Sequence, residues 1–359
     1  MEFYMPTHIY SETDCISHHG DIFQNYGHKA MIVTGKHSSK VDGSLSAVTE
    51  QLEKYEIEYI LYDEVEENPS IEIVMKARAI AVSNNVEFII GIGGGSPMDA
   101  AKAIALMSAN PKADEYVLFI REKLPYLPVI EVPTTAGTGS EVTPWSILTI
   151  HAKRTKSSIS HSIHPAVALI DTTYLKTVPR HSLIETAVDT LAHLTESFLV
   201  TKATDYSRIF CEKGLQLWGS FKEHLLEDTM TDADYEHMMQ ACTLGGIAIT
   251  HTSTGFPHAL SYKITYELGT PHGAACGYTL GGFVRYYANQ DLAGRVLNAL
   301  GFENTDAFQD YLDKLIGIPE ISEELWQADV DALLKNTAKM GTYPYEIDAE
   351  TIRKYLRKK

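Results

Sequence analysis

Short apolar runs alternate with amphipathic stretches along the first half of the chain. The runs KAMIVTG, EYILYDEV, VEFIIGIGGG and LPVIEVPTT predict buried strands, and the intervening segments SLSAVTEQLEKYE and SIEIVMKARAIAVSNN have the apolar spacing of helices. This order is typical of a doubly wound parallel sheet. Beyond residue 178, segments such as HSLIETAVDTLAHLTESFLV show helical spacing and few strand signals. We therefore expect an α/β domain at 1–178 and an all-helical domain at 179–359.

Composition and charge then exclude several classes of partner. The 47 acidic residues outnumber the 30 basic ones, so the field of the protein repels nucleic acid and anionic membranes. No window approaches the roughly 18 apolar residues of a membrane span, and the N-terminus lacks the pattern of a signal peptide. Four scattered cysteines without a CxxC pair argue against a disulfide framework or a thiolate zinc site: Cys15, Cys211, Cys242 and Cys276. We expect a protein of the reducing cytoplasm.

A glycine-rich turn follows the apolar run at 86–92. Gly93, Gly94 and Gly95 lead into SPMDAAKAIALM, which predicts a helix with Ser96 as N-cap, Pro97 at its first position and Asp99 closing a capping box. Free amides at such a helix terminus bind anions, so a pyrophosphate fits there. The alternative is a tight turn without a ligand, because Ser96 occupies the last glycine position of the GxGxxG pattern.

A second polar turn, EVPTTAGTGSEVT at 131–143, follows another apolar strand. Its hydroxyl groups can donate hydrogen bonds to phosphate or a carboxamide, and they belong to Thr134, Thr135, Thr138, Ser140 and Thr143. An ordinary Ser/Thr-rich loop is the alternative. Two such loops at the carboxyl ends of parallel strands favour a dinucleotide site.

The helical half carries a candidate metal-ligand set. Asp189 and His193 are four residues apart and share a helix face, and His258 and His272 follow in GFPHALSYKITYELGTPHGAACG. One carboxylate and three imidazoles suit Fe(II) or Zn(II). Each residue alone is more often a solvated or satisfied side chain, and counting histidines cannot select the ligands, since the same half also contains His181, His224, His237 and His251.

The motifs GGGSPMDAAKAIA, PTTAGTGSEVT, DTLAHLTESF, HALSY and TPHGAACG occur in this order, and the chain resembles the iron-containing alcohol dehydrogenases over essentially its whole length. The resemblance implies a Rossmann-like N-terminal domain, an all-α C-terminal domain and a catalytic metal in the cleft, a fold shared with dehydroquinate synthase. It implies the metal ligands Asp189, His193, His258 and His272, with Fe(II) expected and Zn(II) as the alternative. The implied cofactor contacts are Gly94, Gly95, Ser96, Asp99, Thr134, Thr135, Thr138, Ser140 and Leu175.

The resemblance also implies an activity. We expect hydride transfer between a small primary alcohol or aldehyde and NAD(P), with the metal polarising the substrate oxygen. Alternatives are glycerol dehydrogenase-like polyol oxidation, a dehydroquinate synthase-like lyase, and a dinucleotide-binding sensor with a decayed metal site. A homodimer is the assembly we consider. Trp145, Phe256 and Pro257 flank the motifs as candidates for a small apolar substrate pocket.

Two positions depart from the commoner family pattern. Several members carry a histidine four residues after the third ligand, where this chain has Tyr262, and packing against the site is favoured over proton relay. After the first strand, Gly35 stands where NAD-preferring enzymes place a carboxylate, and it is followed by Lys36, Ser38, Ser39 and Lys40. These cations and hydroxyls suit a 2′-phosphate, which predicts NADP, with NAD as the alternative. A solvated surface turn is the plainer explanation of the same residues.

Overall fold

The computed structural model describes residues 3–153 and 155–357, which form two compact units. The α/β unit comprises Met5–Thr135 and Gly139–Val178. The helical unit comprises Pro179–Lys359 together with Met1–Tyr4 and the short segment Ala136–Thr138. The loop after the fifth strand therefore contributes three residues to the helical unit.

A six-stranded sheet, parallel at every pairing, forms the centre of the α/β unit, with the order β1-β8-β5-β4-β2-β3. Ile32 pairs with Ile90, and Ile90 in turn pairs with Ile130, so the predicted apolar runs lie side by side. The strands are β1 (His8–Ser11), β2 (Lys29–Thr34), β3 (Glu58–Tyr62), β4 (Phe88–Gly93), β5 (Val129–Pro133) and β8 (Val167–Ile170). The predicted α/β class is confirmed. Strand β1 and the antiparallel hairpin of β6 (Ile147–Ile150) and β7 (Thr155–Ser158) were not predicted.

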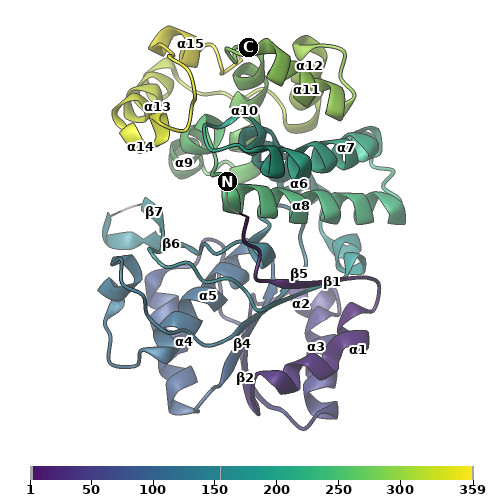
Figure 1. Cartoon of the computed structure of the whole chain (residues 1–359), viewed down its shortest axis with the longest axis vertical. Coiled ribbons are helices and arrows are strands. Elements are labelled where there is room, and N and C mark those ends of the chain that lie inside the picture. Colours follow the sequence, from purple (N-terminus) through teal and green to yellow (C-terminus); the bar gives the residue numbers. More distant parts are fainter. Residues whose placement is uncertain (1–2, 154, 358–359) are drawn as a thin grey trace. The chain divides into compact units, whose positions relative to one another are not determined.

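Helices cover both faces of this sheet, as Figure 1 shows with α4 and α5 on one side of β2 and β4 and α1 and α3 on the other. Met31 and Val33 belong to one buried cluster, and Ala30 and Ile32 to the opposite one. Burial on both faces explains why the strands are continuous apolar runs. The helices are α1 (Cys15–His19), α2 (Ser38–Val41), α3 (Ser44–Lys54), α4 (Ile71–Ser83) and α5 (Gly95–Ala109), with 3₁₀ turns η1 (Gly20–Asn25), η2 (Glu115–Phe119), η3 (Ser140–Val142), η4 (His151–Lys153) and η5 (Thr172–Thr177).

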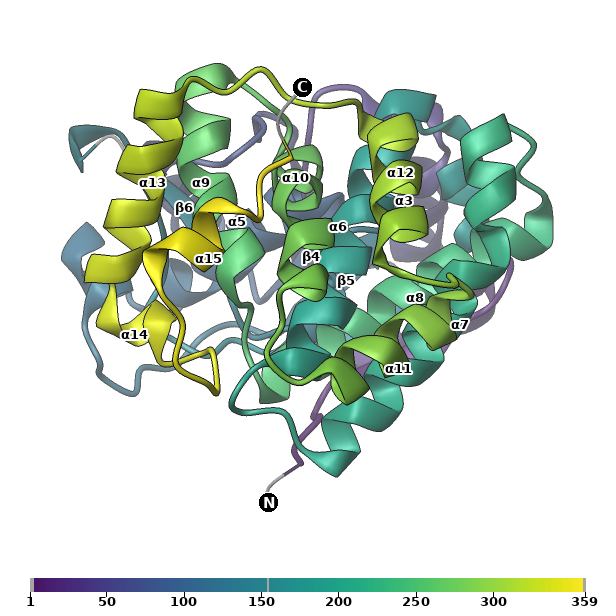
Figure 2. The same ribbon diagram turned by 90° about the horizontal axis from the view of Figure 1, so that it is seen from above.

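The second unit is built from helices, and none of its described residues lies in a strand, which confirms the predicted helical C-terminal part. Figure 2 shows α10 between α9 and α12. The helices are α6 (Arg180–Leu199), α7 (Asp205–Glu227), α8 (Asp232–His251), α9 (Phe256–Leu268), α10 (His272–Arg285), α11 (Gln290–Leu300), α12 (Thr305–Ile316), α13 (Glu323–Lys335), α14 (Thr337–Met340) and α15 (Ala349–Arg353). Capping boxes at Thr204 and Thr231 fix the starts of α7 and α8.

The predicted start of α5 is wrong by two residues. The helix begins at Gly95 with Gly94 as its N-cap, and no side chain caps it. Ser96 instead accepts a hydrogen bond from the Asn68 amide, and Asp99 binds residues of another loop. Pro97 is tolerated inside the first turn because amides there have no helical partner. Among the described residues, no helix has the length and apolarity that crossing a membrane requires.

Candidate metal and dinucleotide sites

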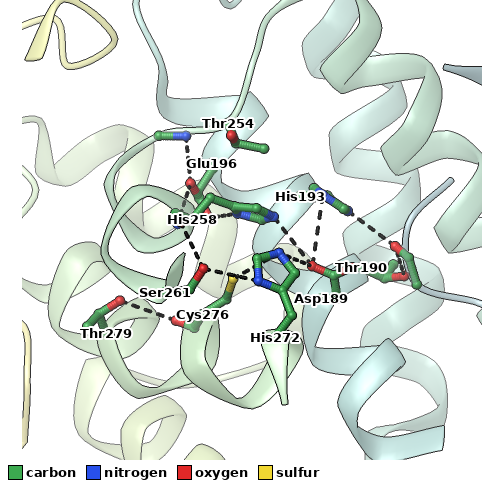
Figure 3. Close-up of polar contacts among 12 residues, drawn as sticks. Asp189, Thr190, His193, Glu196, Thr254, His258, Ser261, His272, Cys276 and Thr279 are labelled. Carbon is green, nitrogen blue, oxygen red and sulfur yellow. Dashed lines mark hydrogen bonds and ion pairs between the residues drawn. The ribbon is translucent and has the colours of Figure 1, made fainter. Parts of the chain in front are cut away.

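Three imidazole side chains of the helical unit converge on one carboxylate oxygen, Asp189 Oδ1 (Figure 3). The Nε2 atom of His258 lies 3.4 Å from this oxygen, that of His272 3.8 Å and that of His193 3.9 Å. Asp189 and His193 come from α6, His258 from the first turn of α9, and His272 is the first residue of α10. The structure thus brings together the four residues that the motifs indicated.

Each of the three imidazoles uses its Nδ1 atom for a different protein contact. His193 Nδ1 lies 3.2 Å from the Gly137 carbonyl, and His272 Nδ1 lies 3.2 Å from Ser261 Oγ. His258 Nδ1 lies 2.5 Å from Glu196 Oε1. Because these acceptors hold the proton on Nδ1, the Nε2 lone pairs remain directed at the common point beside Asp189.

Glu196 is a site residue that the sequence analysis missed. Its side chain is fully buried, and its second oxygen accepts a hydrogen bond of 2.6 Å from the Gly255 amide at the start of α9. A carboxylate that orients a histidine in this way is typical of metal sites. The signal was available, because Asp189, His193 and Glu196 follow the i, i+4, i+7 spacing of one helix face.

The buried polar atoms of the cluster fit a cation. Asp189 Oδ1 and His258 Nε2 are buried and have no hydrogen-bond partner among the described residues, an arrangement that costs free energy unless something compensates it. Burial opposes ionisation of Asp189, yet the imidazoles beside it, His193 first, hold the pKa of this carboxyl well below its usual range. Burial lowers the pKa of His193 to about 4, which keeps the ring neutral, as a ligand must be. One carboxylate and three imidazole nitrogens are a donor set that suits a divalent transition metal.

The other histidines of this unit that make side-chain contacts lie elsewhere. His224 pairs with Asp234, His237 contacts Ser220, and His251 accepts a hydrogen bond from the Tyr4 amide. One further donor does join the cluster, since the ligand atoms of Asp189, His258, His272 and Cys276 all lie within 4.8 Å of one another. The sequence did not indicate this cysteine as a ligand, because it has no CxxC partner.

Tyr262 lies beside the cluster without entering it. Its ring is parallel to that of His272, at a centroid distance of 5.7 Å and an interplanar angle of 5°. Its side chain is exposed, and its hydroxyl makes no hydrogen bond with the described residues. Phe256 and Pro257 are buried, and Phe256 stacks on Tyr343, so these two residues are core rather than pocket. Trp145 is partly buried in the α/β unit.

In the α/β unit, the glycine turn and the hydroxyl-rich turn lie at neighbouring strand ends. The Thr134 amide donates to the Gly93 carbonyl over 2.9 Å, and a Cβ atom at Gly94 would lie 3.0 Å from Thr135 Oγ1. Only a glycine fits that space comfortably, and Gly95 and Ser96 open the helix directly behind it. The amide groups of this turn form the kind of cradle that a pyrophosphate occupies.

Asp99 and Ser140 bind each other and so connect the two turns. Ser140 Oγ donates to Asp99 over 2.6 Å, and the Ile147 amide donates to the other Asp99 oxygen over 2.8 Å. The buried Lys102 ammonium donates to both the hydroxyl and the carbonyl of Ser140. These contacts give Asp99 and Ser140 a positioning role within the protein. Thr134 and Leu175 are buried, and Thr138 belongs to the helical unit.

The turn after β2 departs in part from its predicted role. Ser39 is buried and accepts a hydrogen bond from Thr34, so its hydroxyl group faces the protein. Lys40 pairs with Asp63 at 2.5 Å. Lys36 and Ser38 are exposed, and Lys36 lies 3.7 Å from the exposed Glu66. Ser39 lies in the short helix α2, where its side chain faces Thr34. The sequence pattern did not predict this helix.

The chain thus combines a doubly wound α/β unit with a helical unit that carries a cluster of Asp189 and three histidines. The chain belongs to the iron-containing alcohol dehydrogenase family: the model of "Iron-containing alcohol dehydrogenase" matches residues 6–172, and that of "Fe-containing alcohol dehydrogenase family, C-terminal" matches residues 183–354. These two matches cover most of the chain, and the family acts on small alcohols or aldehydes with a dinucleotide and iron.

Individual relatives agree with this membership. An aldehyde-alcohol dehydrogenase of Streptococcus pneumoniae is 30% identical over 314 residues, covering 82% of this chain but 35% of that protein. An iron-containing alcohol dehydrogenase of Thermotoga maritima has a crystal structure that is 33% identical, with a TM-score of 0.89 over 99% of this chain and 98% of that one. A sulfoacetaldehyde reductase of Bifidobacterium kashiwanohense, solved with NAD⁺, is 27% identical, with a TM-score of 0.86 over 98% and 96% of the two chains.

Proposed function

We propose that this chain is a metal-dependent alcohol dehydrogenase or aldehyde reductase that uses NAD(P). The observation that carries the proposal is the convergence of three Nε2 atoms on Asp189 Oδ1, at 3.4 to 3.9 Å. The family membership supplies the reaction class. The chain spans only 35% of the length of the Streptococcus pneumoniae relative, so the substrate of that protein does not transfer directly. We propose small primary alcohols or aldehydes as substrates.

In this proposal Asp189, His193, His258 and His272 hold a divalent ion, Fe(II) by family and Zn(II) as the alternative. When bound, such an ion supplies a Lewis acid that polarises a substrate oxygen. Asp189 contributes the negative charge that makes burial of a cation affordable. Glu196, Ser261 and the Gly137 carbonyl keep the three imidazoles in the tautomer that presents Nε2.

The dinucleotide is proposed to lie over the turns of the α/β unit. Gly94, Gly95 and Ser96 offer backbone amides to the pyrophosphate, and Thr135 of the same unit offers a hydroxyl group. Asp99 and Ser140 hold the two turns in register through their mutual hydrogen bond. Leu175 lies in η5 after β8 and is fully buried, so it offers the cofactor no polar contact.

The deciding experiment measures turnover and metal content together. The purified protein, loaded with Fe(II) or Zn(II), is mixed with a primary alcohol and NAD or NADP, and formation of reduced cofactor is followed by absorbance. We expect His272→Ala and Asp189→Ala to be metal-poor and inactive but folded. His251→Ala is the matched control, because His251 lies in the same unit but contacts Tyr4 and Phe3. Full activity in metal-free His272→Ala would overturn the assignment.

For the cofactor, we propose a preference for NADP over NAD. Residue 35 is a glycine and therefore places no carboxylate beside the ribose. The nearby exposed residues Lys36 and Ser38 supply one cation and one hydroxyl group for a 2′-phosphate. A Cβ atom at Gly35 would lie 3.5 Å from the nearest atom, the Val65 carbonyl, so a side chain fits there without strain. Gly35→Asp therefore tests charge with little change of fold.

The measurement is kcat/KM with each cofactor for the wild type and for Gly35→Asp, with Gly35→Ala as the uncharged control. We expect the wild type to prefer NADP, Gly35→Ala to keep that preference and Gly35→Asp to lose at least about tenfold of it, since about 1.4 kcal/mol of repulsion suffices. A wild type that prefers NAD would refute the proposal.

A further inference from the structure

The metal cluster contains the sulfur atom of Cys276, to which the resemblance assigned no ligand role. Cys276 follows His272 by four residues on α10, so both side chains share one face of the helix. Its Sγ lies 3.9 Å from His272 Nε2, and the residue is fully buried. Figure 3 shows the sulfur beside the His272 ring.

The spacing of the donor atoms fits a single ion. Zinc bonds of about 2.0–2.3 Å at tetrahedral angles separate neighbouring ligand atoms by roughly 3.3–3.8 Å. The observed separations along the set are 3.4 Å from His258 to Asp189, 3.8 Å from His272 to Asp189 and 3.9 Å from His272 to Cys276. All four ligand atoms lie within 4.8 Å of one another, so one ion can contact all of them after small side-chain adjustments.

A second observation, independent of the cysteine, points to a ligand at this place. Asp189 Oδ1 and His258 Nε2, with side chains only 6% and 3% exposed, have no hydrogen-bond partner among the described residues. Both atoms belong to the group of four that includes the sulfur. His193 stands outside this group, although its Nε2 lies 3.9 Å from the same Asp189 oxygen.

We propose that the Cys276 thiolate is a ligand of the metal ion, which gives this chain a mixed oxygen, nitrogen and sulfur donor set. The inference deepens the proposed function and rests on its metal site. On binding, the thiol S–H bond breaks, a metal–sulfur bond forms and the proton passes to solvent. A thiolate ligand strengthens the binding of thiophilic ions, so the proposal predicts that Cys276→Ala loses affinity for Zn(II) and Co(II).

The test uses Co(II) as the probe, because a cobalt–thiolate bond gives a strong charge-transfer absorption in the near ultraviolet that nitrogen and oxygen ligands do not give. Titrating Co(II) into the metal-free wild-type protein is expected to raise this band until one equivalent is bound. Cys276→Ala should bind Co(II) more weakly and lack the band entirely. Cys211→Ala, which removes another buried thiol of the same unit, should keep it.

The outcomes separate this inference from the proposed function. If the wild type binds one equivalent of Co(II) and turns over alcohol without the thiolate band, or if the band persists in Cys276→Ala, Cys276 is not a ligand and the proposed function stands. If the wild type binds no Co(II), the metal site and the thiolate ligand are both wrong. Thermal unfolding of the metal-free variants checks that any lost band does not reflect a lost fold.

Discussion

At the scale of single residues, the candidate metal site depends on which imidazole nitrogen keeps its proton. Glu196 decides this for His258, because its carboxylate accepts hydrogen bonds from His258 Nδ1 and from the Gly255 amide. The same carboxylate lies in the interior of α6, so its ionised form is tolerated only while these donors face it.

Replacing this carboxylate tests positioning against mere packing. Glu196→Gln keeps the shape of the side chain but removes the charge, so we expect metal affinity to fall about 10- to 100-fold. Competition with a chelator measures the metal affinity. The melting temperature of the metal-free protein shows whether the substitution also weakens the fold. Unchanged affinity with a lowered melting temperature would show that Glu196 only packs.

Tyr262 provides a contrasting case on the neighbouring helix. Its ring lies parallel to His272, and its hydroxyl has no partner among the described residues, so Tyr262→Phe keeps the contact that the structure shows. We expect kcat to change by less than about threefold, whereas loss of a general acid or base costs roughly 10²-fold or more. Rate profiles against pH decide between these, and a hundredfold loss at unchanged metal content would assign a proton relay to Tyr262.

At the scale of helices and strands, the position of His272 depends on how closely α10 approaches α6. A Cβ atom at Gly273 would lie 1.8 Å from the Glu185 carbonyl oxygen and 3.2 Å from the Asp189 amide, both backbone atoms of α6. Backbone cannot rotate aside as a long side chain does. Glycine is therefore required here so that the helix carrying His272 reaches the helix carrying Asp189.

This close approach predicts a coupled loss of stability and metal. Gly273→Ala should push α10 away from α6, cost roughly 3 kcal/mol or more, and remove the metal by displacing His272. Gly294→Ala in α11 is the control, because nothing lies within 4 Å of a Cβ atom there, and alanine should stabilise that helix by about 0.5–1 kcal/mol. Chemical denaturation and metal analysis of both variants check this, and equal stabilities would contradict it.

The elements that the sequence predicted are those whose own pattern is strong. β4 and β5 are buried throughout and β2 is buried beyond Lys29, while α6 has regularly spaced buried apolar residues such as Leu183, Ala187 and Leu191. β1 escaped because it has only four residues and its ends are exposed. The start of α5 was misjudged because Ser96 is a good N-cap by type, yet the glycines before it already adopt helical or capping geometry.

At the scale of the whole molecule, contacts between distant segments escaped sequence reasoning. The segment Ala136–Thr138 belongs to the helical unit, and the carbonyls of Ala136 and Gly137 accept hydrogen bonds from Thr190 and His193 of α6. Backbone carbonyls carry no signal in the sequence. Motif resemblance named Asp189 and the three histidines. Glu196 could have been found from its spacing on the same helix face, whereas the place of Cys276 in the cluster became visible only in the folded structure.

Stability of the whole α/β unit should depend on pH through one buried acid, Glu131 in the central strand β5. Its side chain is fully buried, and neither carboxylate oxygen has a hydrogen-bond partner among the described residues. Burial raises the pKa of Glu131 from its ordinary 4.5 to about 8, although Lys102 favours the charged form. The folded state therefore keeps the proton that the unfolded chain releases near pH 4.5.

The sign of the resulting pH dependence follows. Below about pH 4.5 both states are protonated and Glu131 costs nothing, between about pH 4.5 and 8 the cost grows, and above about pH 8 it is complete. The full cost is on the order of 5 kcal/mol, at about 1.4 kcal/mol for each tenfold change in the ionisation constant.

Glu131→Gln, which mimics the protonated form, should match the wild type near pH 5 and melt several degrees higher near pH 9. Glu58→Gln is the control, since exposed Glu58 pairs with Lys29, which lowers its pKa. Melting curves of the three proteins at both pH values measure the effect, and a Glu131→Gln protein that gains nothing at high pH would show that Glu131 ionises freely in the fold.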